Sequence, residues 1–383
     1  MKRVHLWFVA GLSALLTCAP AQIIYSFESE DLHGYADDNA PGFLEVFQAT
    51  TGVTHGNYSM GVRWPGGFRW LLGNGVRDET LPYLRISRKL LLDITVPAGR
   101  EVEWANMIVA FNGPPGYGWN QNSIPVGLPR VAGTRTILLD LESLPLPAPD
   151  VEWFQLNLGI NAGSAHEIYL DSLRLYRPAC EMVAFTFDSD LQGFNIGDQS
   201  EISLEWFNGK MRVSKEGGFR WLFGGTAPGL AAMVRRGDLV VFDVTVVASA
   251  SQWANAMVAI SSPAGWGQSD YVAEIPTVVG TTRTVALDYR GVALPDSDNP
   301  EYCTLNIAFN SQGYLVLDVD NIRIYRRAVE GDVNCDGCVN DSDLLAVLFE
   351  FGNTAITPAD VNSDGVVNDS DLLTVLFNFG SGC

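Results

Sequence analysis

Short apolar runs recur along most of the chain and are separated by glycine, proline and asparagine. Four of these runs lie in the first half, at residues 90–96, 107–111, 136–140 and 154–160. Runs of this length, bounded by turn residues and without a helical period, are typical of β-strands. The pattern therefore predicts a mainly β fold made of antiparallel sandwiches.

The strand pattern occurs twice along the chain. Residues 66–73 (GGFRWLLG) return as residues 217–224 (GGFRWLFG), and further matches follow in the same order. The period is about 150 residues, which is long enough for a complete domain rather than a solenoid unit. We therefore expect two tandem sandwiches, at residues 22–178 and 183–327.

From residue 331 the pattern changes to two copies of a twelve-residue polar loop, each followed by an apolar run that ends at a glycine. Oxygen-bearing side chains recur at loop positions 1, 3, 5, 9 and 12, and glycine stands at position 6. Calcium takes about six to eight oxygen ligands, and glycine permits the sharp turn that brings them together. With a backbone carbonyl at position 7, the predicted ligands are Asp332, Asn334, Asp336, Cys338, Asn340 and Asp343 in the first loop, and Asp360, Asn362, Asp364, Val366, Asn368 and Asp371 in the second. Each loop should run directly into a helix.

The paired loops resemble type I dockerins, small calcium-binding modules that attach proteins to cohesin domains on polysaccharide-degrading assemblies. The resemblance covers residues 331–383 and implies two calcium ions in this module. In that family, loop positions 10 and 11 contact the cohesin, and the matching residues are Asp341, Ser342, Asp369 and Ser370. Identical pairs in both copies imply a module that docks in either orientation. A calcium-stabilised cap without a partner is the alternative.

Each repeat resembles the jelly-roll carbohydrate-binding modules of the galactose-binding-like kind. The resemblance rests on an opening Phe-acid pair and on a closing strand, DSLRLY at residues 171–176 and DNIRIY at residues 320–325. It implies one structural calcium in each repeat, held by an acid near the first strand and an Asp on the last. These pairs would be Glu28 with Asp171, and Asp188 with Asp320. Surface acids without a metal are the alternative.

A sugar site needs exposed aromatic rings for stacking and polar side chains for hydrogen bonds. The candidate ligand-binding residues are the rings on glycine-rich loops and two strand arginines, namely Tyr117, Trp119, Trp266, Arg69 and Arg220. The rings that alternate with these arginines, together with two further tryptophans, are expected in the core; they are Phe68, Trp70, Phe219, Trp221, Trp104 and Trp253.

Composition narrows the class of protein. A formal charge of −20 opposes binding to nucleic acid and to anionic membranes. No nucleophile elbow, HExxH or paired CxxC pattern occurs, so no catalytic residue is assigned. We therefore expect a polysaccharide-binding protein rather than an enzyme. The alternatives are a glycoside-active enzyme on the same scaffold and a structural or adhesion protein of the cell envelope.

Residues 1–21 show the basic start, apolar centre and small-residue end of a secretory signal peptide; a lipoprotein signal ending at Cys18 is the weaker alternative. No other apolar run approaches the roughly 20 residues that cross a bilayer. We expect an exported protein, extracellular or at the cell surface, without membrane insertion. Five cysteines then remain, and a bridge from the first calcium loop to Cys383 would staple the ends of its module. The odd count leaves at least one thiol free or intermolecular.

Overall fold

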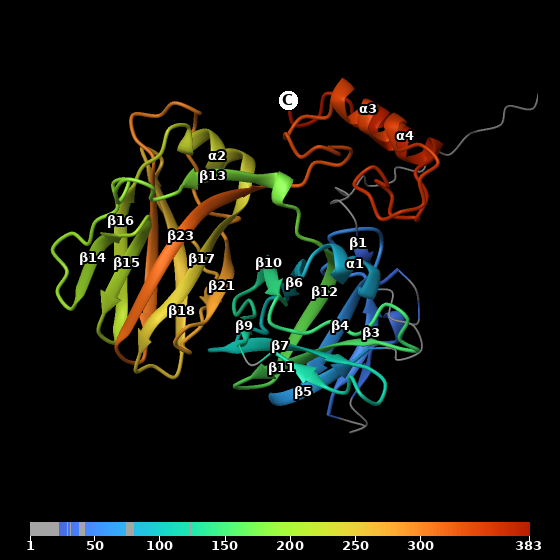
Figure 1. Ribbon diagram of the computed structural model, residues 1–383, viewed down its shortest axis with the longest axis horizontal. Helices are drawn as coiled ribbons and strands as arrows, with labels where there is room; N and C mark the ends of the chain where they lie inside the picture. Colours follow the sequence, from blue (N-terminus) through green and yellow to red (C-terminus); the bar gives the residue numbers. More distant parts are fainter. Residues whose placement is uncertain (1–22, 29, 31, 38–42, 74–79, 123) are drawn as a thin grey trace, which may run out of the picture.

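The computed structural model confirms a mainly β chain with a small helical module at its end (Figure 1). It describes residues 23–28, 30, 32–37, 43–73, 80–122 and 124–383. The predicted signal peptide lies outside the described residues. Within these ranges no helix is long and apolar enough to span a bilayer.

The first sandwich consists of two antiparallel sheets. Sheet A has the strand order β10 (Gly133–Asp140), β6 (Lys89–Val96), β12 (His166–Leu175), β4 (Ser59–Trp64) and β3 (Glu45–Ala49), and β1 (Ile23–Tyr25) pairs with β12. Sheet B has the order β2 (Ala36–Asp37), β5 (Gly67–Leu72), β11 (Gln155–Ala162), β7 (Ala105–Asn112) and β8 (Asn120–Gln121), and β9 (Val126–Gly127) pairs with β7. The four strands predicted in this repeat are all present.

The second sandwich repeats this arrangement. Sheet C has the order β14 (Ile202–Phe207), β15 (Lys210–Lys215), β23 (Leu315–Arg326), β17 (Gly237–Ser249) and β21 (Thr282–Asp288), and β13 (Glu181–Phe185) pairs with β23. Sheet D has the order β16 (Gly218–Gly225), β22 (Thr304–Ser311), β18 (Ala254–Ser262) and β19 (Gly265–Gln268), and β20 (Ala273–Glu274) pairs with β18. Two seven-residue helices, α1 (Thr80–Ile86) and α2 (Leu230–Arg236), were not predicted, because so few residues show no clear period.

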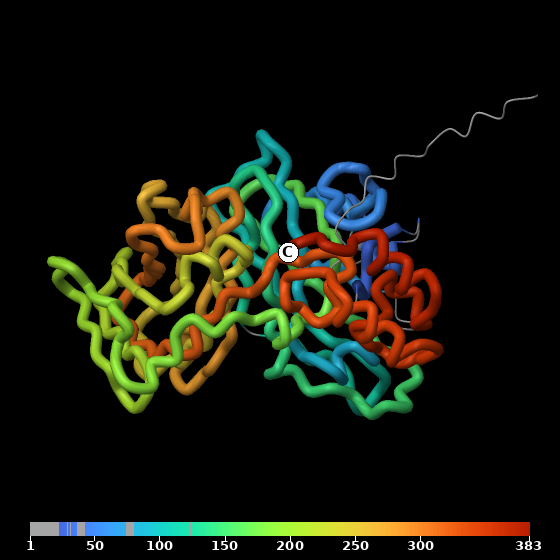
Figure 2. Tube along the Cα trace, turned by 90° about the horizontal axis from the view of Figure 1, so that it is seen from above, coloured from blue at the N-terminus to red at the C-terminus, as the bar shows by residue number. Residues whose placement is uncertain are grey.

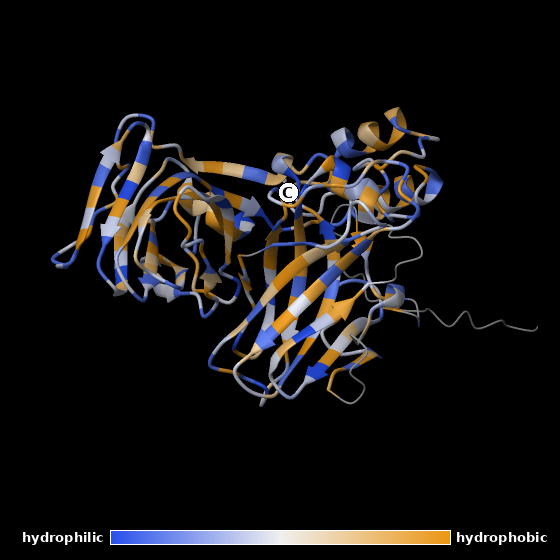
Figure 3. Cartoon of the chain, turned by 60° about the horizontal axis from the view of Figure 1, so that its bottom comes forward, coloured by the Kyte–Doolittle hydropathy of each residue, from blue (hydrophilic) through white to orange (hydrophobic). Residues whose placement is uncertain are grey.

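Side chains along the central strands alternate between the two faces of each sheet, which gives the banding visible in Figure 3. In β6, Leu90 and Leu92 point into the main core, whereas Leu91 points outward. Outward apolar residues of sheets A and C meet in a second, smaller cluster made of Leu91, Leu138, Tyr176, Cys180, Leu239, Val241, Ala286 and Tyr325. The outer faces of sheets A and C therefore pack together where the two sandwiches join.

The edge strands β10 and β21 meet at this junction in a reciprocal contact. The backbone N–H of Thr136 donates to Asp288 Oδ2 at 2.7 Å, and the backbone N–H of Thr284 donates to Asp140 Oδ2 at 3.0 Å. These residues occupy equivalent places in the two repeats, so the two strands run antiparallel about a local two-fold axis. An open sheet edge carries unpaired backbone groups. Here an aspartate of each repeat accepts a hydrogen bond from a backbone N–H on the edge strand of the other repeat.

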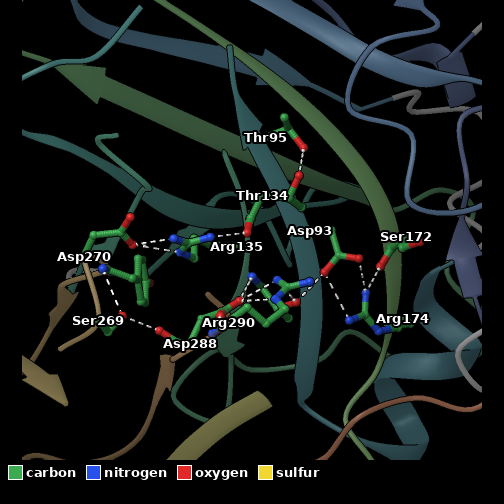
Figure 4. A network of polar contacts seen from close by, with 12 residues as sticks. Asp93, Thr95, Thr134, Arg135, Ser172, Arg174, Ser269, Asp270, Asp288 and Arg290 are labelled. Carbon is green, nitrogen blue, oxygen red and sulfur yellow. Dashed lines mark hydrogen bonds and ion pairs between the residues drawn. The ribbon is translucent and has the colours of Figure 1, made fainter. Parts of the chain in front are cut away.

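Buried charges extend the junction, as Figure 4 shows. Asp93 accepts from Thr136 Oγ1 at 2.5 Å and pairs with Arg174 at 3.1 Å. Burial acts to raise the pKa of Asp93, but Arg174 and Arg290 outweigh it, and the pKa lies below its usual value. Arg290 also donates to Thr136 Oγ1 at 2.8 Å, which ties the second sandwich to this group.

The other two sheets also meet at the junction. The hydroxyl of Tyr271 donates to the carbonyl of Gly127 at 2.9 Å, and β9 lies beside β20. The short strands β9 and β20 therefore extend the contact between the sandwiches beyond β10 and β21.

The C-terminal module lies above the junction, close to β1 and to the joint between the sandwiches (Figures 1 and 2). Its helices, α3 (Asp341–Phe349) and α4 (Asp369–Phe377), share a core of Val333, Val339, Val347, Ala359, Val361, Val367 and Val375. A disulfide joins Cys338 to Cys383, which confirms the predicted staple, and a second joins Cys335 to Cys180. Cys303 is a free thiol, so the odd count is also accounted for within the described residues.

Candidate functional site

Each calcium loop turns at its position-6 glycine and enters its helix from inside the loop. Gly337 and Gly365 have φ values of 92° and 89°, a conformation that favours glycine. Asn340 and Asn368 at position 9 cap the helices, accepting from the N–H groups of Ser342 and Ser370 at 2.8 and 2.7 Å. Both predicted loop-then-helix units are therefore present.

The position-12 aspartates hold the two ends of each loop together. Asp343 accepts from the N–H of Val333 at 2.8 Å and from the N–H of Asn340 at 2.9 Å. Asp371 accepts from the N–H of Asn362 at 3.1 Å and from that of Asn368 at 2.8 Å. Asp343 and Asp371 are fully buried. The aspartate at position 12 therefore lies inside each loop.

Asp332 at loop position 1 and Asp336 at loop position 5 provide further oxygens. Gly337 N–H donates to Asp332 Oδ2 at 2.9 Å, while Asp332 Oδ1 is buried and has no hydrogen-bond partner among the described residues. Asp336 Oδ1 accepts from the N–H of Cys338 at 2.9 Å. Three similar hydrogen bonds span two residues each. Asn334 Oδ1 accepts from the N–H of Asp336, Asn362 Oδ1 from that of Asp364, and Asp364 Oδ1 from that of Val366. The carbonyls of Cys338 and Val366 accept from the position-9 amides at 3.1 and 2.9 Å.

This set of donors fits a calcium ion. All ligand atoms are carboxylate, amide or carbonyl oxygens, which a hard cation prefers, and the buried, unpartnered Oδ1 of Asp332 is suited to an ion. Burial raises the pKa of Asp332 and of Asp360, and the neighbouring acids of each loop raise both further. Within the described ranges, acidic, histidine and cysteine side chains do not gather in groups of three or more that could hold a metal ion by themselves. An ion in either loop would therefore also need the predicted amide and backbone oxygens as ligands.

The helices present an exposed face next to the loops. Asp341, Ser342, Asp369 and Ser370 are all exposed, at the first turn of α3 and of α4. Phe349 and Phe377 follow on these helices with exposed fractions of 83% and 77%. The apolar residues that continue the two faces are Leu345 and Leu348 on α3, and Leu373 and Leu376 on α4. The four predicted docking residues therefore lie beside apolar surface on both helices.

An aromatic cluster covers the outer face of sheet B. Phe68 and Trp70 of β5 lie over Gly159 of β11, where a Cβ atom would come within 2.7 Å of Phe68 and 2.9 Å of Trp70. Trp119 packs edge-on against Trp70, with ring centroids 4.8 Å apart, and remains 43% exposed. We call Phe68, Trp70 and Trp119 the first platform.

Sheet D carries the same cluster. Trp221 and Trp266 pack edge-on at 5.1 Å, and Phe219 and Trp221 at 5.5 Å. Trp266 is 46% exposed. We call Phe219, Trp221 and Trp266 the second platform. Contrary to the expectation that Phe68, Trp70, Phe219 and Trp221 belong to the core, these rings lie on the solvent side of their sheets, because Leu71 and Leu222 on the alternate face fill the core instead.

Tyr117 does not belong to either platform. Its hydroxyl donates to the carbonyl of Pro145 at 2.6 Å, and its half-buried ring packs against the main core. Burial raises the pKa of Tyr117 to about 12. Trp119, not Tyr117, is the equivalent of Trp266, since each packs against the corresponding tryptophan of its sheet.

The two arginines point to the opposite side of their strands from the platform rings. The guanidinium of Arg69 lies 5.0 Å from the ring centre of Phe43. Arg220 pairs with Glu201 and donates to the carbonyl of Ser200 at 3.2 Å. They therefore do not join the aromatic clusters. Trp104 and Trp253, which were expected in the core, are exposed at the starts of β7 and β18.

The acids proposed for structural calcium in the sandwiches lie close together in pairs. Glu28 and Asp171 both accept backbone N–H groups from one loop: Asp171 from His55 at 2.8 Å and Glu28 from Asn57 at 2.9 Å. Burial raises the pKa of Asp320, and Asp188 is among the acids that raise it further. A calcium ion at either pair remains a prediction.

Comparison with known proteins identifies the C-terminal module. Residues 330–376 match the model of the dockerin type I domain family. The module that the paired loops predicted is therefore a dockerin type I domain, and the match covers this part of the chain alone. No curated protein matches the chain.

The sandwiches are similar to several solved structures at low identity. The N-terminal CBM22-1-CBM22-2 tandem domain of Paenibacillus barcinonensis Xyn10C is 11% identical, with 81% of this chain and 98% of that chain covered and a TM-score of 0.28. The family 11 carbohydrate-binding module of Clostridium thermocellum is 10% identical, with 41% and 95% covered and a TM-score of 0.29. A Paenibacillus xanthan lyase is 10% identical, with 81% and 27% covered and a TM-score of 0.22. Similarities of this size carry no argument about function.

Proposed function

We propose that this chain is an exported, non-catalytic polysaccharide-binding protein that attaches to a cohesin-type partner through its C-terminal module. The two platforms hold the glycan, and the module, loaded with two calcium ions, presents its helices for docking. The repeated platform carries the proposal, because both repeats keep the same edge-on tryptophan pair on an exposed sheet face. Exposed rings of this kind suit the apolar faces of sugars.

Calcium would neutralise the acidic ligands that each loop brings together. Asp332 and Asp360 provide the first ligand of each loop, and Asp343 and Asp371 the last. The exposed face of each helix supplies apolar contact area, with Leu345 and Phe349 on α3 and Leu373 and Phe377 on α4. Because the two faces match, we propose that the module docks through either helix.

Retention of the full chain on insoluble polysaccharides and on a glycan array tests the sugar-binding half. We expect the wild type to be retained without release of new reducing ends, and a Trp119→Ala, Trp266→Ala double variant to be lost in the wash. Release of reducing ends would favour the glycoside-active alternative. Retention on no glycan would favour the structural or adhesion alternative and contradict the proposal.

Binding to a panel of type I cohesin domains tests the docking half. We expect a complex in calcium, because the calcium-loaded loops position the helices. An absence of binding to every cohesin in calcium would reduce the module to the calcium-stabilised cap considered above.

A further inference from the structure

The two calcium loops share one pattern but differ at positions 4 and 7. These positions are Cys335 and Cys338 in the first loop, and Ser363 and Val366 in the second. Cys335 is bridged to Cys180 at the joint between the sandwiches, and Cys338 is bridged to the last residue of the chain. The first loop is therefore anchored by disulfides at two positions, and the second loop contains no cysteine.

A buried guanidinium also lies behind the first loop. Arg177, which follows the last strand of the first sandwich, is nearly fully buried and donates from Nη2 to the carbonyl of Val333. Arg177 and Asp332 line the same small cavity between the loop and the sandwiches. A positive charge thus lies close to the carboxylates that calcium would otherwise neutralise.

The second loop is held less firmly. A hydrogen bond of 3.1 Å from the N–H of Ile23 to Ser363 Oγ links this loop to the first sandwich. Residues 364–366 at its turn are all exposed. Asp360, Asp364 and Asp371 are the three acidic ligands predicted in this loop.

We infer that the two halves of the module respond differently to calcium: the first loop and α3 stay folded when calcium is removed, whereas the second loop and α4 fold only with calcium. Two disulfides reduce the chain entropy that the first loop must lose on folding. Arg177 offsets part of the repulsion among its acids. The second loop has no disulfide, so calcium alone must offset both its loss of chain entropy and the repulsion among its acids.

The asymmetry has a consequence for the proposed docking function, although the folding asymmetry itself needs no partner. The face of α3, with Leu345 and Phe349, would persist at any calcium concentration. The face of α4, with Leu373 and Phe377, would be formed only in calcium. Calcium concentration would then change the number of docking faces from one to two.

Hydrogen–deuterium exchange of the full-length oxidised chain, with and without a calcium chelator, tests the inference. In chelator we expect amides of α4 to exchange at the rate of an unfolded chain, and amides of α3 to exchange at least about tenfold more slowly. In calcium both helices should be protected. Parallel loss of protection in α3 and α4, or no loss in either, would overturn the inference.

Cysteine variants separate the covalent contribution from the rest. A Cys180→Ser, Cys335→Ser double variant should lose α3 protection in chelator and keep it in calcium. Cys303→Ser removes the free thiol and should behave as the wild type. Since the double variant could disturb the joint between the sandwiches, thiol reduction of the folded wild type provides a second measurement. If α3 stays protected in chelator after complete reduction, the disulfides are not the cause.

An Arg177→Gln variant tests the contribution of the buried guanidinium. It should make the protection of α3 in chelator at least about threefold weaker while leaving its protection in calcium unchanged, because calcium then neutralises the acids. Hydrogen–deuterium exchange needs neither a cohesin nor a glycan. A result that contradicts the folding asymmetry is therefore distinguishable from a failure of the proposed binding functions.

Discussion

At the residue scale, the two platforms separate rings that face solvent from rings that hold the sandwich together. Trp119 and Trp266 are nearly half exposed, whereas the hydroxyl of Tyr117 is engaged by a backbone carbonyl. The first two are therefore available to a ligand, and Tyr117 is not. This difference can be measured, because binding and stability should respond to different residues.

Replacing Trp119 or Trp266 by Ala should weaken glycan binding by about 1–3 kcal/mol, by analogy with the stacking of bases on aromatic side chains. The midpoint of thermal unfolding should change little, since each ring is largely outside the core. Isothermal titration with a bound oligosaccharide measures the first effect, and calorimetry the second. A large loss of stability with unchanged affinity would show that the rings are packing residues.

Tyr117→Phe provides the matched contrast. It removes the hydroxyl that donates to Pro145 and should lower the free energy of unfolding by about 0.5–1.5 kcal/mol. Glycan affinity should remain that of the wild type. Loss of affinity in this variant would place Tyr117 in the binding site after all.

The sequence alone predicted that the rings of Trp119 and Trp266 are exposed, because a glycine-rich loop has few side chains that could cover a ring. It misplaced Phe68 and Trp70 for a physical reason. Alternation along a strand separates the two faces of a sheet, but it does not indicate which face another sheet covers. Leu71 and Arg69 share the inner side of β5, so apolar character did not distinguish the faces either.

At the element scale, α3 and α4 are the best-predicted parts of the chain. The spacing of oxygens and glycine in each loop is tied to one geometry, so loop, cap and helix follow from the sequence together. The disulfide from Cys335 to Cys180 was not predicted, because only the folded chain brings residues 155 positions apart together. The junction was not predicted either, since Asp140 and Asp288 have the sequence context of ordinary strand ends.

Docking through either helix can be tested with charges placed on the exposed faces. Leu345→Asp and Leu373→Asp should each leave cohesin affinity within about threefold of the wild type in calcium, because the other face remains available. The double variant should lose docking, since a buried apolar anchor contributes about 2 kcal/mol or more. Surface plasmon resonance measures the affinities. Both side chains are exposed, so circular dichroism should show unchanged helices; abolition of docking by one single variant would contradict docking in either orientation.

At the scale of the whole molecule, the junction of β10 and β21 fixes the relation between the sandwiches. Asp288→Ala would leave the N–H of Thr136 without its acceptor and the guanidinium of Arg290 without its carboxylate partner. We expect a loss of about 3–5 kcal/mol in urea unfolding, as for other broken buried ion pairs. Asp140→Ala breaks hydrogen bonds alone and should cost about 1–3 kcal/mol.

Asp298→Ala is the control for these two variants. Its two arginine partners lie at the surface, where an ion pair contributes about 0–1 kcal/mol. Equal effects of all three substitutions would show that the junction does not couple the sandwiches.

The junction should also respond to pH. Burial raises the pKa of Glu274, on β20, to about 7, although Arg130 acts to lower it. A carboxyl whose pKa is higher in the folded protein stabilises the fold fully below its unfolded value of 4.5 and loses this contribution as pH rises through about 7. Glu274→Gln should therefore flatten the fall in melting temperature between about pH 5 and pH 8. An unchanged slope in the variant would rule out Glu274 as its source.

The reciprocal contact between Thr136 with Asp140 and Thr284 with Asp288 is the contact that two identical subunits make about a two-fold axis. Each repeat carries both halves of it, the donor amide and the acceptor carboxylate. In a dimer of separate chains such a contact weakens on dilution by mass action. Here both copies belong to one polypeptide. Their mutual protection is therefore independent of protein concentration and persists at any dilution.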